Sequence, residues 1–111
     1  MGLIYTKSFG GGTCVGRIDN SGNVYTGSFG GSYKGKVDSN GYVLTPSLSV
    51  VGRINSNGQV YSGAIGGSYK GKVDLSGNIY DNSGFLFGSI IAKAEPPNQR
   101  AGGAAYLILL R

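Results

Sequence analysis

GRIDNSGNVY, at residues 16–25, has the composition of two short strands joined by a tight turn. Asp19 stands at the first turn position, where its side chain accepts a hydrogen bond from the backbone ahead of it. Gly22 stands at the fourth position, where a positive φ returns the chain into the second strand. The β-branched residues Ile18 and Val24 flank the turn and are expected to face each other across it. This stretch therefore predicts a β-hairpin with an apolar pair on one face.

The same pattern occurs three more times along the chain. Residues 15–50 align with residues 51–86 without a gap, and each of these halves contains two copies of the unit. A single two-stranded hairpin is marginally stable in water, so the repeated hairpins are expected to bury their apolar faces together. The four copies are GRIDNSGNVY (16–25), GKVDSNGYVL (35–44), GRINSNGQVY (52–61) and GKVDLSGNIY (71–80).

A fifth unit is split between the two ends of the repeat. GSI at 88–90 matches a first strand without its turn, and GLIY at 2–5 matches a second strand with its turn glycine in front. We therefore predict that a strand at 86–91 pairs with a strand at 2–6, which also removes an exposed sheet edge. The predicted fold class is all-β, a closed ring of five two-stranded hairpin petals with pseudo-five-fold symmetry.

Two other positions recur once in each unit. Glycine within a strand often marks a close backbone approach, so strand glycines are expected where the petals converge on an axis. These glycines are Gly16, Gly35, Gly52, Gly71 and Gly88. An apolar residue also stands between successive units and is expected to form a third layer of the core. These apolar residues are Phe9, Phe29, Leu48, Ile65 and Phe85.

The C-terminal part of the sequence differs from the repeat. We expect residues 1–91 to form the five-petal domain and residues 92–111 to form a connector and an apolar segment that pack on the same domain. AAYLILL at 104–110 is too apolar to remain in water and far too short to span a membrane. We expect it to cap the broad face of the ring or to enter its axis, where Ala104 and Ala105 suit a narrow passage. In a rival arrangement it pairs as a strand between chains and makes a homo-oligomer.

The five G-x-[VI] units, the glycine-rich connections and the C-terminal GGAAYLILL (102–110) resemble the five-fold beta-flower proteins, small bacterial domains of unassigned function. The resemblance covers nearly the whole chain. It implies a ring of petals and transfers no functional residues. Members of that family carry an export signal ahead of the repeats, whereas no basic and apolar signal segment opens this sequence. We therefore expect a cytoplasmic protein, or an exported one whose signal segment has been removed.

The doubled segment GGSYKGKVD, at 30–38 and 66–74, comes close to a phosphate-binding loop. That loop requires a Ser or Thr after its G-K pair and a helix behind it, but Val37 and Val73 stand at this position and a turn follows. The sequence has no histidine and one cysteine, Cys14, and its aspartates are accounted for by turns. We therefore expect no catalytic residue, no metal site and no cofactor, and a protein that is not an enzyme.

The charge distribution indicates where a partner would bind. Ten Lys and Arg residues against five Asp and Glu residues give a net charge of +5, which favours anionic partners. Four cations share one position of the unit and are expected on the face opposite the glycines and valines, as a partial ring broken at Ser89. The alternative is a solvated outer face paired with the turn aspartates. The four cations are Arg17, Lys36, Arg53 and Lys72.

Tyrosines accompany these cations. Tyr25 and Tyr61 share a second-strand position, and Tyr33 and Tyr69 precede the strand lysines, so they offer rings for stacking on sugars or bases. The alternative is that they fill spaces between petals. We predict a non-enzymatic module that acts through binding or assembly. The alternative function is a basic module that binds anionic polymers, nucleic acid or lipid headgroups, and a glycan is a further candidate partner.

Overall fold

The protein is a closed barrel of ten antiparallel strands with one short helix at its C-terminus. The computed structural model describes residues 2–6, 12–27, 29–82, 90–96 and 98–111. Consecutive strands pair with each other, and β1 pairs with β10 to close the barrel. The strands are β1 (Gly2–Thr6), β2 (Thr13–Ile18), β3 (Asn23–Thr26), β4 (Tyr33–Val37), β5 (Tyr42–Leu44), β6 (Val50–Ile54), β7 (Gln59–Ser62), β8 (Tyr69–Val73), β9 (Asn78–Tyr80) and β10 (Ile90–Ala94). The predicted all-β closed ring is confirmed.

The predicted hairpin turns are present with the expected chemistry. One carboxylate oxygen of Asp19 accepts hydrogen bonds from the backbone of Ser21 and Asn23, each at 2.9 Å. Gly22 has a φ of +89° and donates its N–H to the Asp19 carbonyl at 3.1 Å. Ile18 lies directly opposite Val24. The same bonds recur in the turns that begin at Asp38, Asn55 and Asp74.

The barrel closes between the two ends of the repeat, as predicted, but the last strand lies further along the chain. β10 runs from Ile90 to Ala94, and Ile4 of β1 lies opposite Ala94. Ala92 lies opposite Ile79, just as Gly71 lies opposite Val60 in an earlier pair. Ala92 therefore occupies the matching small-residue position of β10. The predicted Gly88 lies, with residues 86–89, outside the described residues. The connector accordingly starts at Glu95 and not at residue 92.

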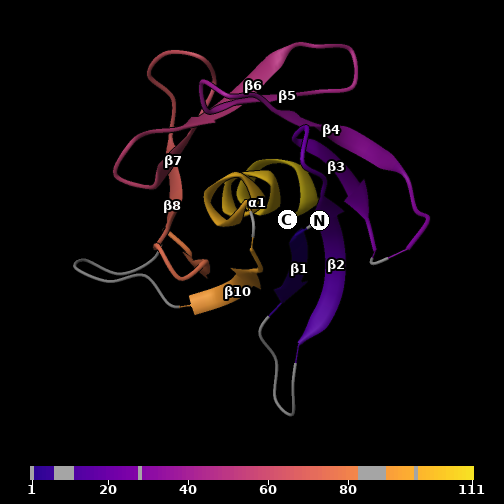
Figure 1. Ribbon diagram of the computed structural model, residues 1–111. Helices are drawn as coiled ribbons and strands as arrows, with labels where there is room; N and C mark the ends of the chain where they lie inside the picture. Colours follow the sequence, from indigo (N-terminus) through magenta and orange to yellow (C-terminus); the bar gives the residue numbers. More distant parts are fainter. Residues whose placement is uncertain (1, 7–11, 28, 83–89, 97) are drawn as a thin grey trace.

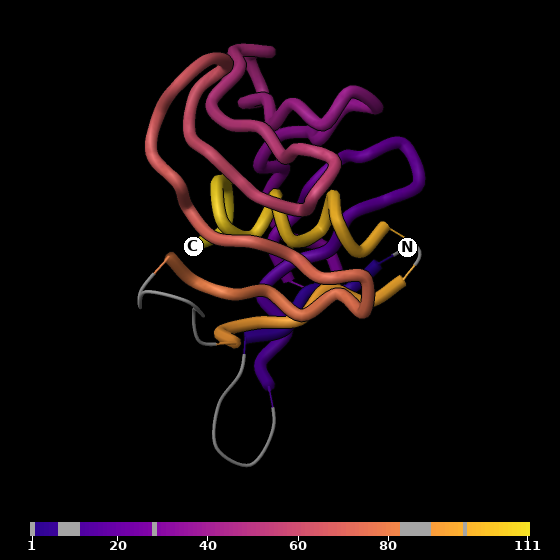
Figure 2. The backbone as a smooth tube through the Cα atoms, turned by 90° about the vertical axis from the view of Figure 1, so that its left-hand side faces the viewer, coloured from indigo at the N-terminus to yellow at the C-terminus, as the bar shows by residue number. Residues whose placement is uncertain are grey.

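The C-terminal segment enters the axis of its own ring. Helix α1 (Gln99–Ala105) continues into a π-helical turn, η1 (Tyr106–Leu110), in which Arg111 N–H donates to the Tyr106 carbonyl at 2.8 Å. Figure 1 shows this helix at the centre of the ring, and Figure 2 shows it crossing the molecule between the strands. The molecule is flat, with extents of 36 × 35 × 19 Å. Within the described part of the chain, no helix has the length and apolarity needed to cross a bilayer.

The core consists of the hairpin apolar pairs packed around the small residues of the helix. Ala104 and Ala105 are fully buried, as the prediction of a narrow passage requires. Gly102 and Gly103 precede them, and a Cβ on Gly103 would collide with the side chain of Val73. The strand residues of this core are Ile4, Ile18, Val24, Val37, Val43, Val60, Val73, Ile79, Ala92 and Ala94.

The strand glycines make room for the helix. A Cβ on Gly16 would lie 2.6 Å from Leu110 Cδ1, and a Cβ on Gly52 would lie 2.8 Å from Ile108 Cδ1. The expected close backbone approach is also present, because a Cβ on Gly35 or Gly71 would collide with a carbonyl oxygen of the neighbouring strand. Four consecutive helix residues contact four successive hairpins: Leu110 at Gly16, Leu109 at Gly35, Ile108 at Gly52 and Leu107 at Gly71.

The predicted third layer of the core is wrong for every member that the structure describes. Phe29 is 94% exposed, Leu48 67% and Ile65 91%. Because the helix already fills the centre of the ring, the connections between hairpins remain outside it. Phe9 and Phe85 lie outside the described residues.

Candidate functional site

The four cations predicted to share a position do so in the structure. Arg17, Lys36, Arg53 and Lys72 are half-buried, and each stands between a buried strand glycine and the β-branched residue that follows it. The alternation of a strand therefore places them on the outer face of the barrel. Three of them lie opposite a tyrosine in the hairpin register: Arg17 opposite Tyr25, Arg53 opposite Tyr61 and Lys72 opposite Tyr80.

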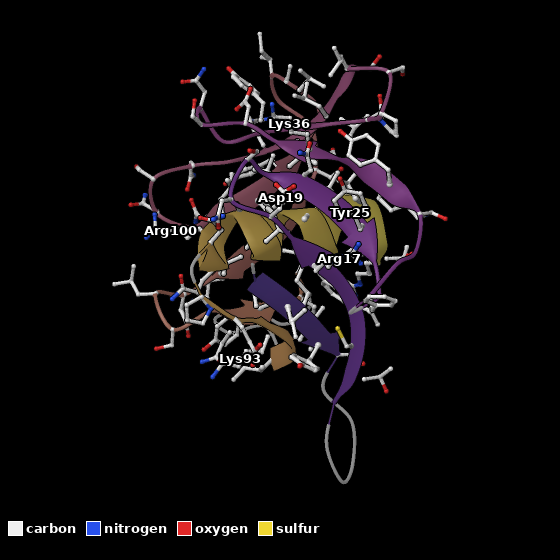
Figure 3. All side chains as sticks on the ribbon, turned by 45° about the vertical axis from the view of Figure 1, so that its right-hand side comes forward. Arg17, Asp19, Tyr25, Lys36, Lys93 and Arg100 are labelled. Carbon is white, nitrogen blue, oxygen red and sulfur yellow. The ribbon has the colours of Figure 1, made fainter. Side chains whose placement is uncertain are left out.

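Arg17 is held in place by three contacts. Its guanidinium carbon lies 4.7 Å from the centre of the Tyr25 ring. Its Nη1 donates to the carbonyls of Thr26 at 3.1 Å and Gly27 at 3.3 Å. Figure 3 shows Arg17 and Tyr25 together on the outside of the strands, with Lys36 and Lys93 elsewhere on the barrel. The guanidinium therefore stacks on a tyrosine, in contrast to the alternative that it pairs with a turn aspartate.

A β-bulge brings a second tyrosine into this cluster. Asn23 lies opposite Lys36 and Val24 opposite Gly35, but Tyr25 lies opposite Tyr33, so Lys34 is an extra residue in the ladder. A bulge re-aims the side chains that precede it, and here it puts Tyr33 on the same outer face as Lys36. The rings of Tyr25 and Tyr33 are 5.5 Å apart and tilted by 53°.

The second repeat contains the same cluster. Arg53 lies 5.0 Å from the Tyr61 ring, and its Nη1 donates to the carbonyls of Ser62 and Gly63 at 3.2 and 3.1 Å. The rings of Tyr61 and Tyr69 are 5.6 Å apart. Burial and then the neighbouring Tyr61 raise the pKa of the Tyr69 hydroxyl. Two cation–tyrosine clusters, Arg17–Tyr25–Tyr33 and Arg53–Tyr61–Tyr69, are thus built in the same way.

The two lysines of the set have different surroundings. Lys72 Nζ lies 5.0 Å from the Tyr80 ring, and the Tyr80 hydroxyl donates to Asp74 at 3.1 Å. This hydrogen bond, burial and the negative charge of Asp74 raise the pKa of Tyr80. Lys36 lies opposite Leu44, which provides an aliphatic side chain in place of a ring.

Lys93 is a fifth cation of the set that the sequence analysis missed. It lies opposite Tyr5 in the pairing of β1 with β10, as Arg17 lies opposite Tyr25. An open pocket of about 350 Å³ adjoins it, with Tyr5, Asn78 and Glu95 among its lining residues. The ring of cations was expected to break at Ser89, which lies outside the described residues. AKA at 92–94 is the matching sequence signal, but Ala replaces Gly and no D-x-x-G turn follows it.

The segments that approach a phosphate-binding motif are parts of strands. Lys36 and Lys72 lie within β4 and β8, and Val37 and Val73 are buried in the core. An Asp turn and not a helix follows each of them. In the described ranges, no group of three or more His, Cys, Asp or Glu side chains is placed to hold a metal ion.

Comparison with family models, with curated proteins and with solved structures finds no match to this chain.

Proposed function

We propose that the protein is a non-enzymatic binding module whose outer face binds an anionic polymer through its cation–tyrosine clusters. The observation that supports this most directly is the duplication of one stack, Arg17–Tyr25–Tyr33, as Arg53–Tyr61–Tyr69. Packing of the barrel does not require an arginine over each tyrosine, because these side chains lie outside the core.

The chemistry of the stack suits an anion next to an apolar ring. A guanidinium has five N–H donors, and the two carbonyls at each cluster engage only Nη1, which leaves Nε and Nη2 for a sulfate, phosphate or carboxylate. The carbonyls hold the arginine in one orientation before a ligand arrives, which lowers the entropic cost of binding. Tyr33 and Tyr69, each more than one-third exposed, present ring surface next to the cation.

The duplication of the cluster favours a polymeric ligand over a small one. The clusters lie in different hairpins of one closed ring, so a chain molecule that follows the circumference can contact both. Two weak sites on one rigid body then act together through their effective concentration.

The proposal includes a β-flower architecture with five petals and pseudo-five-fold symmetry. The petals would be β2–β3, β4–β5, β6–β7, β8–β9 and the pair of β10 with β1. The recurrent register of the hairpins supports this architecture. In every petal, the cation of the first strand lies opposite the same position of the second strand. The pairs are Arg17–Tyr25, Lys36–Leu44, Arg53–Tyr61, Lys72–Tyr80 and Lys93–Tyr5.

Retention on a heparin column tests the binding proposal. We expect salt-dependent retention of the protein and its loss in the double variant Arg17→Ala with Arg53→Ala. A second pair, Arg17→Lys with Arg53→Lys, keeps the charge but removes the planar guanidinium with its Nε and Nη2 donors, so it should elute clearly earlier than the unmodified protein. Thermal melting confirms that the variants are folded. Absence of retention at low salt, or equal elution of the lysine pair, would overturn the role of the clusters.

The non-enzymatic part of the proposal has its own test. A steady-state assay of nucleotide hydrolysis addresses the reaction that the doubled GGSYKGKVD segment most resembles. We expect no turnover above a buffer control. Turnover that is lost in Lys36→Ala or Lys72→Ala would contradict the proposal.

A further inference from the structure

The barrel has two chemically different ends. Because consecutive strands are antiparallel neighbours, the connections alternate between these ends. The D-x-x-G turns lie at one end, which we name the turn end, and α1 begins there, since Asn98 donates to the Asp19 carbonyl at 3.1 Å. The longer connections between hairpins lie at the other, the loop end. Arg111, the residue that follows η1, lies at the loop end. Together with Ser62 and Asn82 it lines an open pocket there.

Each described hairpin connection at the loop end carries an apolar residue at its tip. Phe29 and Ile65 are 94% and 91% exposed, and Leu48 is 67% exposed. Packing does not explain these side chains. Leu48 also has a φ of +71°, which is uncommon for a residue other than glycine.

The bases of these connections are closed by hydrogen bonds from backbone N–H groups to side-chain hydroxyl groups. Thr26 Oγ1 accepts from the Ser32 N–H at 2.8 Å, and Ser62 Oγ accepts from the Ser68 N–H at 2.9 Å. Thr45 Oγ1 accepts from the Ser49 N–H at 3.1 Å. The three loops therefore share one construction, a closed polar base and an apolar tip.

Charge is distributed unequally between the two ends. Lys34 and Lys70 are the second residues of β4 and β8, at the loop end, and Arg111 is exposed there. The loop end also has one acidic residue, Asp81. The turn end has a cation, Arg100, which donates a hydrogen bond to the Ser56 carbonyl. The remaining described acidic residues lie at the turn end: Asp19, Asp38, Asp74 and Glu95.

We propose that the loop end docks on an anionic lipid bilayer, with Phe29, Leu48 and Ile65 inserted at the interface and Lys34, Lys70 and Arg111 facing the headgroups. Apolar insertion combined with basic charge is the pattern by which proteins bind anionic membrane surfaces. The tips lie on separate loops that radiate from the central helix (Figure 1). Separate side chains insert individually between lipids, whereas a protein partner needs one contiguous, well-packed patch. This surface is independent of the cation–tyrosine clusters.

A tryptophan reporter tests the docking directly, because the sequence contains no tryptophan. Phe29→Trp should show a blue-shifted emission when vesicles of phosphatidylcholine mixed with phosphatidylglycerol are added. Leu75→Trp is the matched control, since Leu75 is 79% exposed in a turn at the opposite end, and its emission should not change. Equal shifts in both variants, or none in Phe29→Trp, would overturn the proposal.

Co-sedimentation with the same vesicles measures the contribution of each group. Phe29→Ser with Ile65→Ser should weaken binding at least about tenfold, because two large apolar side chains no longer insert. Lys34→Gln with Lys70→Gln should weaken it about tenfold at low salt and flatten its salt dependence. Leu75→Ser should bind like the unmodified protein. Unchanged binding of the serine pair would show that the tips do not insert.

Two further measurements distinguish lipid docking from polymer binding at the clusters and from self-association. Arg17→Lys with Arg53→Lys should elute earlier from heparin but bind vesicles normally. Phe29→Ser with Ile65→Ser should be retained on heparin normally but bind vesicles weakly. If both variants lose both activities, the loop end is not a separate surface. Sedimentation velocity without lipid tests a second copy as the occupant: self-association that the serine pair abolishes, without vesicle binding, would overturn the lipid assignment.

Discussion

The turn end and the loop end of the barrel both reverse the chain, but they use side chains in opposite ways. At the turn end, the Asp or Asn side chain accepts two backbone N–H groups, so the residue that begins the turn also stabilises it. At the loop end, Thr26 and Ser62 close the base of the connection while Phe29 and Ile65 extend into solvent. The fold explains the Asp and Asn side chains of the turns and the Thr and Ser side chains at the loop bases, but it does not explain the apolar tips.

The difference indicates which residues are available for function. A side chain that satisfies backbone groups or fills the core is constrained by stability, whereas an exposed apolar side chain is not. The cation–tyrosine clusters lie between these extremes, because their contacts are local and half-exposed. Binding is therefore best sought on the outer face and at the loop end.

The largest expected effect comes from removing the helix that connects the two ends. Deletion of residues 104–111 removes Ala104, Ala105, Tyr106 and Leu107 from the core. Each large buried side chain contributes about 2–5 kcal/mol, so the loss should approach the whole stability of a small domain. We expect no cooperative thermal transition and strong binding of a hydrophobic dye. Deletion of the exposed Arg111 alone is the control, and a truncated protein that melts normally would contradict the structure.

The next largest effect on stability is expected at glycines, and it differs between a glycine of the turn end and a glycine of the loop end. Gly22, in a turn, and Gly30, in a loop, have φ values of +89° and +65°. A Cβ on Gly22 would collide with the Val37 carbonyl, whereas no atom of the described residues lies within 4 Å of a Cβ on Gly30. Gly22→Ala should therefore cost about 3 kcal/mol or more, and Gly30→Ala about 1 kcal/mol, in urea unfolding. Equal losses would mean that backbone conformation alone, and not crowding, explains the turn glycines.

A smaller effect concerns Leu48. Its φ of +71° is one that glycine adopts without strain. Because the side chain is largely exposed, Leu48→Gly should leave stability unchanged or raise it by up to about 1 kcal/mol. The same variant should weaken binding to anionic vesicles. A clear loss of thermal stability would show that Leu48 has a structural role.

The smallest effect is on the pH dependence of stability. Burial by itself would raise the pKa of Asp74, but hydrogen bonds from Asn78, Tyr80 and Ser76 outweigh it and hold the carboxyl pKa below its ordinary value. A lowered folded pKa adds stability above the unfolded pKa of about 3.9, and this stability is lost as the pH falls through the folded value. Asp19 behaves in the same way.

Asp74→Asn tests this dependence, since Asn55 already performs the turn function in the third hairpin. The variant should show a shallower fall in melting temperature below about pH 4 than the unmodified protein. Asp38→Asn makes the same substitution in another turn, and the acid dependence of its melting temperature is the matched comparison. An acid dependence that is unchanged in Asp74→Asn would assign it to other carboxylates.

Local chemistry made much of this fold predictable. Asp19 and Gly22 form their turn through bonds that span at most four residues, and the same holds for the three later turns. Pairing of Ile18 with Val24 follows from the turn, because turn geometry sets the register of a hairpin. The shared outward position of Arg17, Lys36, Arg53 and Lys72 follows in turn from strand alternation.

The remaining features depend on contacts between segments that are distant in sequence. Because the C-terminal helix occupies the axis, Phe29, Leu48 and Ile65 stay outside the ring. For the same reason the strand glycines lie next to leucine and isoleucine side chains of the helix. The register of β10 against β9 and β1 decided that Lys93 joins the cations, and the bulge at Lys34 decided that Tyr33 meets Tyr25. The sequence by itself determined the hairpins, because each is stabilised by its own hydrogen bonds. Only the tertiary structure decided what fills the ring and what remains exposed, because burial depends on which segment occupies the shared interior.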